Sequence, residues 1–212
     1  MAASKIKICG VTTPAAIDAA IAARADYVGF NFHPPSPRFL TPGNAAALTE
    51  QVQGRAVVVG VFVDVDDATI AEAITSGKLD AIQLHGSETP ERAAQVKARF
   101  GLPVWKVLSV ATADDVSKAD AYRDASDFIL FDAKTPKGSM PGGMGLTFDW
   151  SLLSAYRGPL PWGLAGGLTP TNVADAVRAT GAPMVDTSSG VESGPGIKDA
   201  ELIAAFCRAA RS

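Results

Sequence analysis

Eight short apolar runs, roughly 25 residues apart, alternate along the chain with alanine-rich segments of helical character. Each run is almost wholly apolar, which is typical of parallel strands covered on both faces. A chain with this pattern is constrained to an α/β fold whose parallel sheet is wrapped by helices. The predicted strands are Lys5–Cys9, Tyr27–Phe32, Ala56–Val63, Ala81–His85, Val104–Ser109, Phe128–Asp132, Leu160–Ala165 and Pro183–Thr187.

The intervening segments carry helix signals at both ends. A threonine N-cap followed by proline, a common helix start, occurs at Thr13-Pro14, Thr89-Pro90 and Thr169-Pro170. Glycines of the kind that end helices occur at Gly54, Gly77, Gly101 and Gly181. The predicted helices are residues 14–25, 43–53, 67–77, 89–100, 112–123, 149–156, 170–180 and 199–210.

Eight strand–helix units favour a (β/α)8 barrel formed by residues 1–212 as a single domain. An open doubly wound sheet is the structural alternative. That fold usually has fewer strands and a G-x-G-x-x-G motif after the first strand, where this chain has Gly10-Val11-Thr12. A chain of this length buries roughly 70% of its unfolded surface, so it needs neither a disulfide nor a metal to fold.

Composition excludes several classes of function. The 19 basic and 22 acidic residues give a net charge of −3, which argues against a nucleic-acid-binding protein. No run of eighteen apolar residues predicts a membrane span, and no apolar signal-peptide core precedes Gly10. Only Cys9 and Cys207 occur, and such sparse usage predicts a cytoplasmic protein with free thiols.

A (β/α)8 barrel carries its active site at the carboxyl ends of its strands, which selects candidate residues. Cys9 ends the first strand and is either a small buried side chain or a nucleophile or base. Asp132 ends the sixth strand beside a glycine-rich loop and is a candidate acid or base. Cys207, near the chain end, is interpreted as a core residue.

Three further polar side chains lie at the end of the fourth strand or after the second. Arg38 lies in a proline-braced loop, where its guanidinium would either bind a carboxylate or phosphate bidentately or be solvated. His85 is expected to line the pocket, and His33 to pack against the proline loop. Neither histidine has partners at metal-ligand spacing, so no metal site is predicted.

Two loops predict a phosphate site. Gly166 and Gly167 follow the seventh strand, and Ser188, Ser189 and Gly190 follow the eighth. Barrels often bind phosphate with these two loops and the N-terminus of a short helix, whose exposed N–H groups attract an anion. The alternative is that the glycines only make tight turns. The glycine-rich stretch Lys134–Thr147 is interpreted as a lid, with an ordinary surface loop as the alternative.

Motifs at the strand ends run in order along nearly the whole chain: Lys7-Ile8-Cys9-Gly10, Gly29-Phe30-Asn31-Phe32, Ser36-Pro37-Arg38, Val59-Gly60-Val61-Phe62-Val63, Gln83-Leu84-His85-Gly86, Gly142-Gly143-x-Gly145, Phe148-Asp149-Trp150, Leu164-Ala165-Gly166-Gly167-Leu168, Val185-Asp186-x-Ser188-Ser189-Gly190-Val191-Glu192 and Pro195-Gly196-Ile197-Lys198-Asp199. In these motifs the chain resembles phosphoribosylanthranilate isomerases. Met144 departs from the pattern, because a small hydroxyl residue is usual there.

The resemblance implies an Amadori rearrangement of N-(5-phosphoribosyl)anthranilate in tryptophan biosynthesis, without metal or redox cofactor. The family's general base falls on Cys9 and its general acid on Asp132. By the same resemblance Arg38 faces the anthranilate, Asp186 the ribose hydroxyls, and the loops after strands seven and eight the phosphate. The expected partner is a small phosphosugar, and the protein is expected to be a monomer or a homodimer.

Three alternatives remain at this point. Indole-glycerol-phosphate synthase relies on lysine and glutamate and the histidine-pathway sugar isomerase on two aspartates, so neither explains Cys9. A catalytically silent phosphosugar-binding barrel would have no use for both Cys9 and Asp132. Acceptance of the histidine-pathway substrate is left open by the sequence.

Overall fold

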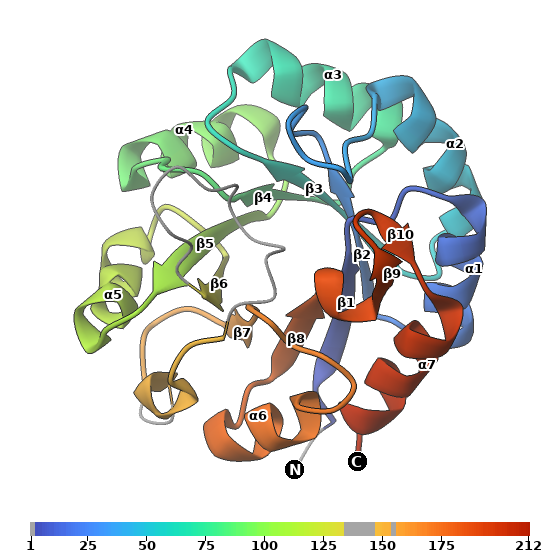
Figure 1. Ribbon diagram of the computed structural model, residues 1–212. Coiled ribbons are helices and arrows are strands. Elements are labelled where there is room, and N and C mark those ends of the chain that lie inside the picture. Colours follow the sequence, from blue (N-terminus) through green and yellow to red (C-terminus); the bar gives the residue numbers. More distant parts are fainter. Residues whose placement is uncertain (1–2, 134–146, 154–155) are drawn as a thin grey trace.

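The computed structural model describes residues 3–133, 147–153 and 156–212, and its eight parallel strands close into a barrel in chain order, as predicted (Figure 1). The barrel excludes the open sheet, because β1 pairs with both β2 and β8. The strands are β1 Lys5–Cys9, β2 Tyr27–Asn31, β3 Val57–Phe62, β4 Ala81–Leu84, β5 Val104–Val110, β6 Phe128–Ala133, β7 Trp162–Leu164 and β8 Met184–Thr187.

Helices surround the strands on the outside of the barrel (Figure 1). Their bounds are α1 Pro14–Ala22, α2 Pro42–Val52, α3 Asp67–Gly77, α4 Pro90–Phe100, α5 Ala113–Ser117, α6 Val173–Thr180 and α7 Ala200–Ala209. Thr13 and Thr89 cap α1 and α4 as predicted. The start predicted at Thr169 is wrong: the Asn172 carboxamide bonds the N–H of Thr169 and the carbonyl of Gly167, which holds the segment as a loop until Val173.

The glycine ends are confirmed at two of four positions. Gly101 and Gly181 adopt left-handed conformations, with φ of 66° and 69°, directly after α4 and α6. Directly after α2 and α3 that conformation is taken by non-glycine residues, Gln53 with φ 51° and Lys78 with φ 45°, and Gly54, with φ 70°, follows Gln53 in the same conformation. Gly77 is the last residue of α3.

Two predicted helices are shorter than expected. Residues 112–123 form α5 followed by the 3-10 helix η1, Lys118–Tyr122. In the described part of 149–156, only the 3-10 helix η2, Trp150–Leu153, is found. The sequence also did not predict the small hairpin of β9 Glu192–Gly194 and β10 Ile197–Lys198, which follows the 3-10 helix η3, Ser189–Val191.

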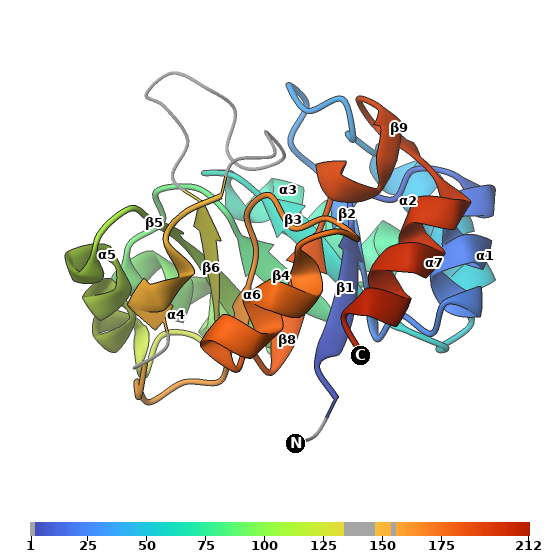
Figure 2. The same ribbon diagram turned by 60° about the horizontal axis from the view of Figure 1, so that its bottom comes forward.

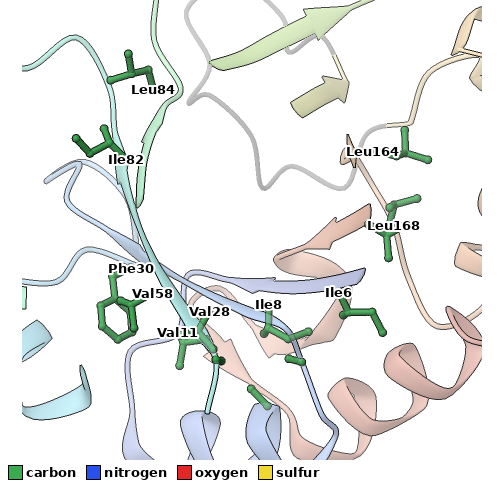
Figure 3. Close-up of a cluster of buried hydrophobic side chains, with 14 of the residues drawn as sticks. Ile6, Ile8, Val11, Val28, Phe30, Val58, Ile82, Leu84, Leu164 and Leu168 are labelled. Atoms are coloured by element: carbon green, nitrogen blue, oxygen red, sulfur yellow. The ribbon is translucent and has the colours of Figure 1, made fainter. Parts of the chain in front are cut away.

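Alternation along the strands separates two apolar layers. Ile6, Ile8, Val28, Val58 and Ile82 face the helices and form part of the outer core (Figure 3). The barrel interior holds a second cluster: Val59, Ala81, Trp105, Val107, Leu130, Ala165 and Met184. Side chains at positions i and i+2 of a strand share a face. On β1, Ile6 and Ile8 therefore point outward, and Lys7 and Cys9, which alternate with them, point into the barrel.

Aspartates join adjacent strands at the amino-terminal end of the barrel. Asp26, Asp80 and Asp127 each directly precede an even-numbered strand. Their carboxylates accept hydrogen bonds of 2.8–2.9 Å from backbone N–H groups at the start of the preceding strand, from Ile6, Val58 and Val104 respectively. This end of the barrel therefore supports the register of the strands.

Asp26→Ala should lower the free energy of unfolding by about 1–3 kcal/mol, because the buried N–H of Ile6 loses its acceptor. Asp26→Asn keeps an acceptor oxygen and should lose clearly less. Urea unfolding of both variants measures the difference, and equal losses would show that the hydrogen bond has no part in stability.

Candidate active site

The carboxyl ends of the strands surround a hollow that collects every site residue predicted from the sequence. Seven of the eight strands or the loops after them contribute to its wall. The lining residues are Cys9, Asn31, Ser36, Arg38, Val61, His85, Asp132, Ala165, Gly166, Gly167, Leu168, Asp186, Thr187, Ser188, Ser189 and Gly190. The structure thus places the candidates together, and the role of each is a separate question.

Cys9 and Asp132 reach this hollow from different sides of the barrel. Cys9 ends β1 and Asp132 lies in β6, with β7 and β8 between these strands on one side and four strands on the other. Both side chains point inward by the alternation of their strands. A small molecule in the hollow would meet the thiol and the carboxyl on different faces.

Asp132 is held by two contacts. Its Oδ2 lies 3.2 Å from Nε2 of His85, and its Oδ1 accepts a 2.8 Å hydrogen bond from the N–H of Ala133. Asp132 is 6% exposed, so its carboxyl is largely shielded from water. The contact with His85 offers Asp132 a neighbour that can exchange a proton with it.

A buried network fixes the loop that carries His85. Lys106 Nζ lies 2.8 Å from Oε2 of Glu88 and donates to the carbonyl of Gly86 at 2.7 Å. The Glu88 carboxylate also accepts from the backbone N–H groups of Asp64 and Gly86. These bonds hold the chain directly after His85 in one conformation.

Lys7 and Asp186 form a buried ion pair at the base of the hollow, which Asp186 lines and Lys7 does not. Their strands place them opposite each other in the β1–β8 ladder, and Lys7 Nζ lies 3.1 Å from both carboxylate oxygens. Burial alone would lower the pKa of Lys7, but the Asp186 carboxylate and Cys9 outweigh it and raise the pKa. Burial raises the pKa of Asp186 even though Lys7 opposes the change.

Cys9 has a free thiol, whose burial and whose positively charged neighbour have opposite effects on its pKa. Burial raises its pKa above the ordinary cysteine value, while the positive charge of Lys7 acts in the opposite direction. The thiol is therefore the favoured form of Cys9 at neutral pH. Cys207 is also free and is buried against α1 and the outer core, as predicted.

Arg38 is not solvated but binds a carboxylate bidentately, and this carboxylate belongs to the protein itself. Its Nε and Nη2 donate bidentately to Glu192, at 2.8 and 2.7 Å, although the residue lines the hollow. Glu192 also binds Lys198 at 2.6 Å, and Lys198 donates to the carbonyl of Ser188. The network joins the loop after β2 to the β9–β10 hairpin, which rise together at the same end of the barrel (Figure 2).

Close backbone contacts require glycine in the two candidate phosphate loops. A Cβ on Gly166, whose φ is +88°, would lie 2.5 Å from the backbone nitrogen of Ala133. A Cβ on Gly190 would lie 1.9 Å from the carbonyl oxygen of Leu168, so the two loops touch here. Ser188 Oγ donates to the carbonyl of Cys9 at 3.1 Å, which ties the loop after β8 to β1.

Sequence reasoning assigned no role to Lys7, Glu192 or Lys198. The signal for Lys7 was a lysine inside an apolar strand, two residues before Cys9. Pairing of Glu192 with Arg38 joins residues 154 positions apart, which no local pattern reports. His33 follows its expectation in part, because its carbonyl accepts from Ser36 of the proline loop.

The predicted lid falls almost wholly outside the residues that the structure describes, whereas a metal site and a membrane span can be judged within them. The proposed lid lies outside them except for Thr147, and so does Met144. Within the ranges described, no three His, Cys, Asp or Glu side chains are grouped to hold a metal ion. The same ranges contain no helix with the length and apolarity to cross a membrane.

Comparison with known proteins gives consistent matches over nearly the whole chain. The N-(5'-phosphoribosyl)anthranilate (PRA) isomerase family matches residues 6–209. The isomerase of Paramagnetospirillum magneticum is 55% identical over 98% of this chain and 97% of its own. The chain is similar to the crystal structure of monomers generated from the dimeric Thermotoga maritima isomerase, with a TM-score of 0.84 and 36% identity over 98% of both chains. It is also similar to the crystal structure of a PRA isomerase in complex with reduced 1-(o-carboxyphenylamino)-1-deoxyribulose 5-phosphate, with a TM-score of 0.85 and 34% identity over 98% of both chains.

Glu192→Gln should destabilise the protein by about 3 kcal/mol or more at neutral pH, because Arg38 and Lys198 keep buried charges without their carboxylate. Those two cations outweigh burial and lower the pKa of Glu192. A lowered folded pKa gives stability that is present above the ordinary value of 4.5 and lost as the pH falls through the folded pKa.

The difference between parent and variant in chemical denaturation should therefore shrink below about pH 4. Glu50→Gln is the matched control, since its ion pair with Lys78 is exposed and should contribute less than about 1 kcal/mol. A Glu192→Gln effect as small as the control's, or one that persists unchanged in acid, would refute this account of the network.

Proposed function

Because the chain belongs to the N-(5'-phosphoribosyl)anthranilate isomerase family, we propose that Cys9 is the general base of its reaction and Asp132 the general acid. The protein is an isomerase of tryptophan biosynthesis. It converts N-(5-phosphoribosyl)anthranilate to 1-(2-carboxyphenylamino)-1-deoxyribulose 5-phosphate by an Amadori rearrangement. The observation that carries the assignment is that the thiol and the carboxyl line one hollow from different strands.

The proposed reaction begins with ring opening. Asp132 gives its proton to the furanose oxygen, the bond from C1 to this oxygen breaks, and the nitrogen lone pair forms a protonated Schiff base. The Cys9 thiolate then removes the proton from C2, and the electrons of that bond neutralise the nitrogen to give an enolamine. Loss of the C2 hydroxyl proton and protonation at C1 give the ketone, so the atoms balance as an isomerisation.

The structure supports the choice of these groups over the rival barrels. The buried lysine and glutamate pair, Lys106 and Glu88, does not line the hollow, which disfavours an enzyme that relies on lysine and glutamate. Of the two aspartates that line it, Asp186 is bound by Lys7 through both oxygens and is less suited to exchange protons than Asp132. Cys9 remains the group best placed to act opposite Asp132.

We propose that the substrate phosphate binds between the Gly166–Gly167 loop and the Ser188–Gly190 turn. Both loops line the hollow, and glycine lets their backbone N–H groups approach an anion closely. Asp186 then lies near the ribose hydroxyls and His85 beside Asp132. The two bonds to Glu192 use Nε and Nη2 of Arg38, and the remaining guanidinium donors are proposed to contact the anthranilate carboxylate.

We also propose that the protein acts in the cytoplasm, as a monomer or a homodimer. Two free thiols suit a reducing compartment, and the net charge of −3 suits neither nucleic acid nor an anionic membrane surface. The relative from Thermotoga maritima is described as dimeric, and monomers have been generated from it.

Cys9→Ser and Asp132→Asn should each reduce kcat by at least about a hundredfold, because a well-placed acid or base contributes roughly 10²–10⁴-fold. A serine hydroxyl is too weak an acid to replace the thiolate, and an amide cannot donate the ring-opening proton. Stopped-flow fluorescence of substrate consumption measures turnover, and product titration should show nearly unchanged binding. Turnover within a few-fold of the parent in Cys9→Ser would exclude the thiolate as base and make His85 the next candidate.

Gly190→Ala should weaken competitive inhibition by inorganic phosphate at least about tenfold, because displacing the loop removes charge-assisted backbone hydrogen bonds. Gly43→Ala is the control, since a Cβ there meets nothing within 4 Å. An inhibition constant unchanged in Gly190→Ala would place the phosphate elsewhere.

A further inference from the structure

Lys7 is a fully buried lysine on the inner face of β1, two residues before Cys9. Side chains two residues apart share a face, so Lys7 lies one layer below Cys9 and does not line the hollow. A hydrophobic side chain of similar size would fill this position at lower free-energy cost than a charged pair. The position therefore calls for a reason other than stability.

Two contacts define the place of the Lys7 ammonium. It lies 3.1 Å from each of the two oxygens of Asp186, and its side chain shares the inner face of β1 with Cys9. Gly29, which pairs with Cys9 in the β1–β2 ladder, leaves room for this arrangement. A Cβ at Gly29 would lie 2.9 Å from Cys9 Sγ and 3.3 Å from Lys7 Cε.

The charges around Cys9 change the pKa of its thiol in opposite directions. Burial and Asp186 disfavour the thiolate, whereas Lys7 and, more weakly, Lys198 of β10 favour it. Across the hollow, Asp132 raises the pKa of Asp186 and His85 lowers it. Lys7 is thus the strongest favourable charge that Cys9 meets.

We propose that Lys7 is a positioning residue, whose ammonium, fixed by Asp186, holds the Cys9 side chain and stabilises the thiolate that removes the C2 proton. The inference rests on the proposed role of Cys9 as base. Asp186 acts through Lys7 by keeping it protonated in spite of burial. Lys7 itself cannot be the base, because an ammonium has no free electron pair.

The test measures the reactivity of Cys9 with iodoacetamide against pH, without substrate, by mass spectrometry of the Cys9 peptide. Only the thiolate is alkylated at a useful rate. In Lys7→Met the Cys9 rate at pH 8 should fall at least about tenfold and recover at higher pH, since a neighbouring charge moves a pKa by roughly 1–3 units. The pH profile of kcat should also shift to higher pH, while the affinity for the product stays nearly unchanged.

Two internal controls accompany this measurement. Lys5→Met removes an exposed lysine from the same strand face, two residues further from Cys9, and should leave the profile unchanged. Burial raises the pKa of Cys207 to about 11, so its peptide should remain slow to react in every variant.

Lys7→Met leaves Asp186 buried without its partner and could disturb folding, so Lys7→Met/Asp186→Asn removes both charges together. Its Cys9 rate should fall in the same direction, because Lys7 influences Cys9 more than Asp186 does. A Cys9 profile equal to the parent's in either folded variant overturns the proposal. The assignment of Cys9 as base fails separately, if Cys9→Ser retains turnover, because the alkylation experiment involves no catalysis.

Discussion

The alternation of side chains on the strands of a closed barrel is the constraint on which the site depends. On β1 it sends Ile6 and Ile8 to the helices and Lys7 and Cys9 to the interior. On β8 the same rule sends Val185 outward and Asp186 inward, opposite Lys7. A shift of one residue in either strand would bury charge in the outer core, so the hydrophobic pattern that folds the barrel also fixes its chemistry.

The charged groups beneath and beside the hollow are all buried and paired with groups of opposite charge. Lys7 with Asp186, Lys106 with Glu88, and Glu192 with its two cations are each removed from water and satisfied by several bonds. Such pairs add little stability compared with apolar packing. Their value here lies in fixing the geometry and charge of the groups above them, because each bond restricts the position of a loop or strand that lines the hollow.

The fold was predictable from the sequence because parallel strands and their helices leave local, repeated signals. Two helix ends were predicted wrongly because other local arrangements compete with the expected ones. The Asn172 carboxamide bonds residues three and five positions before it and delays the start of α6, and Lys78 takes the left-handed position expected of glycine after α3. All predicted site residues line the hollow, since strand ends meet there in any such barrel. The bond from Arg38 to Glu192 could not be foreseen, because it joins loops far apart in sequence.

The most direct test of the account is a crystal structure of this protein with the reduced product analogue in the hollow. In that structure Cys9 Sγ is expected within about 3–4 Å of the carbon that corresponds to C2, a near-attack distance for proton transfer. The Asp132 carboxyl is expected within hydrogen-bond reach of the oxygen that came from the furanose ring, on another face of the sugar. An analogue whose C2 lies against Asp186 or His85 and away from Cys9 would contradict the account.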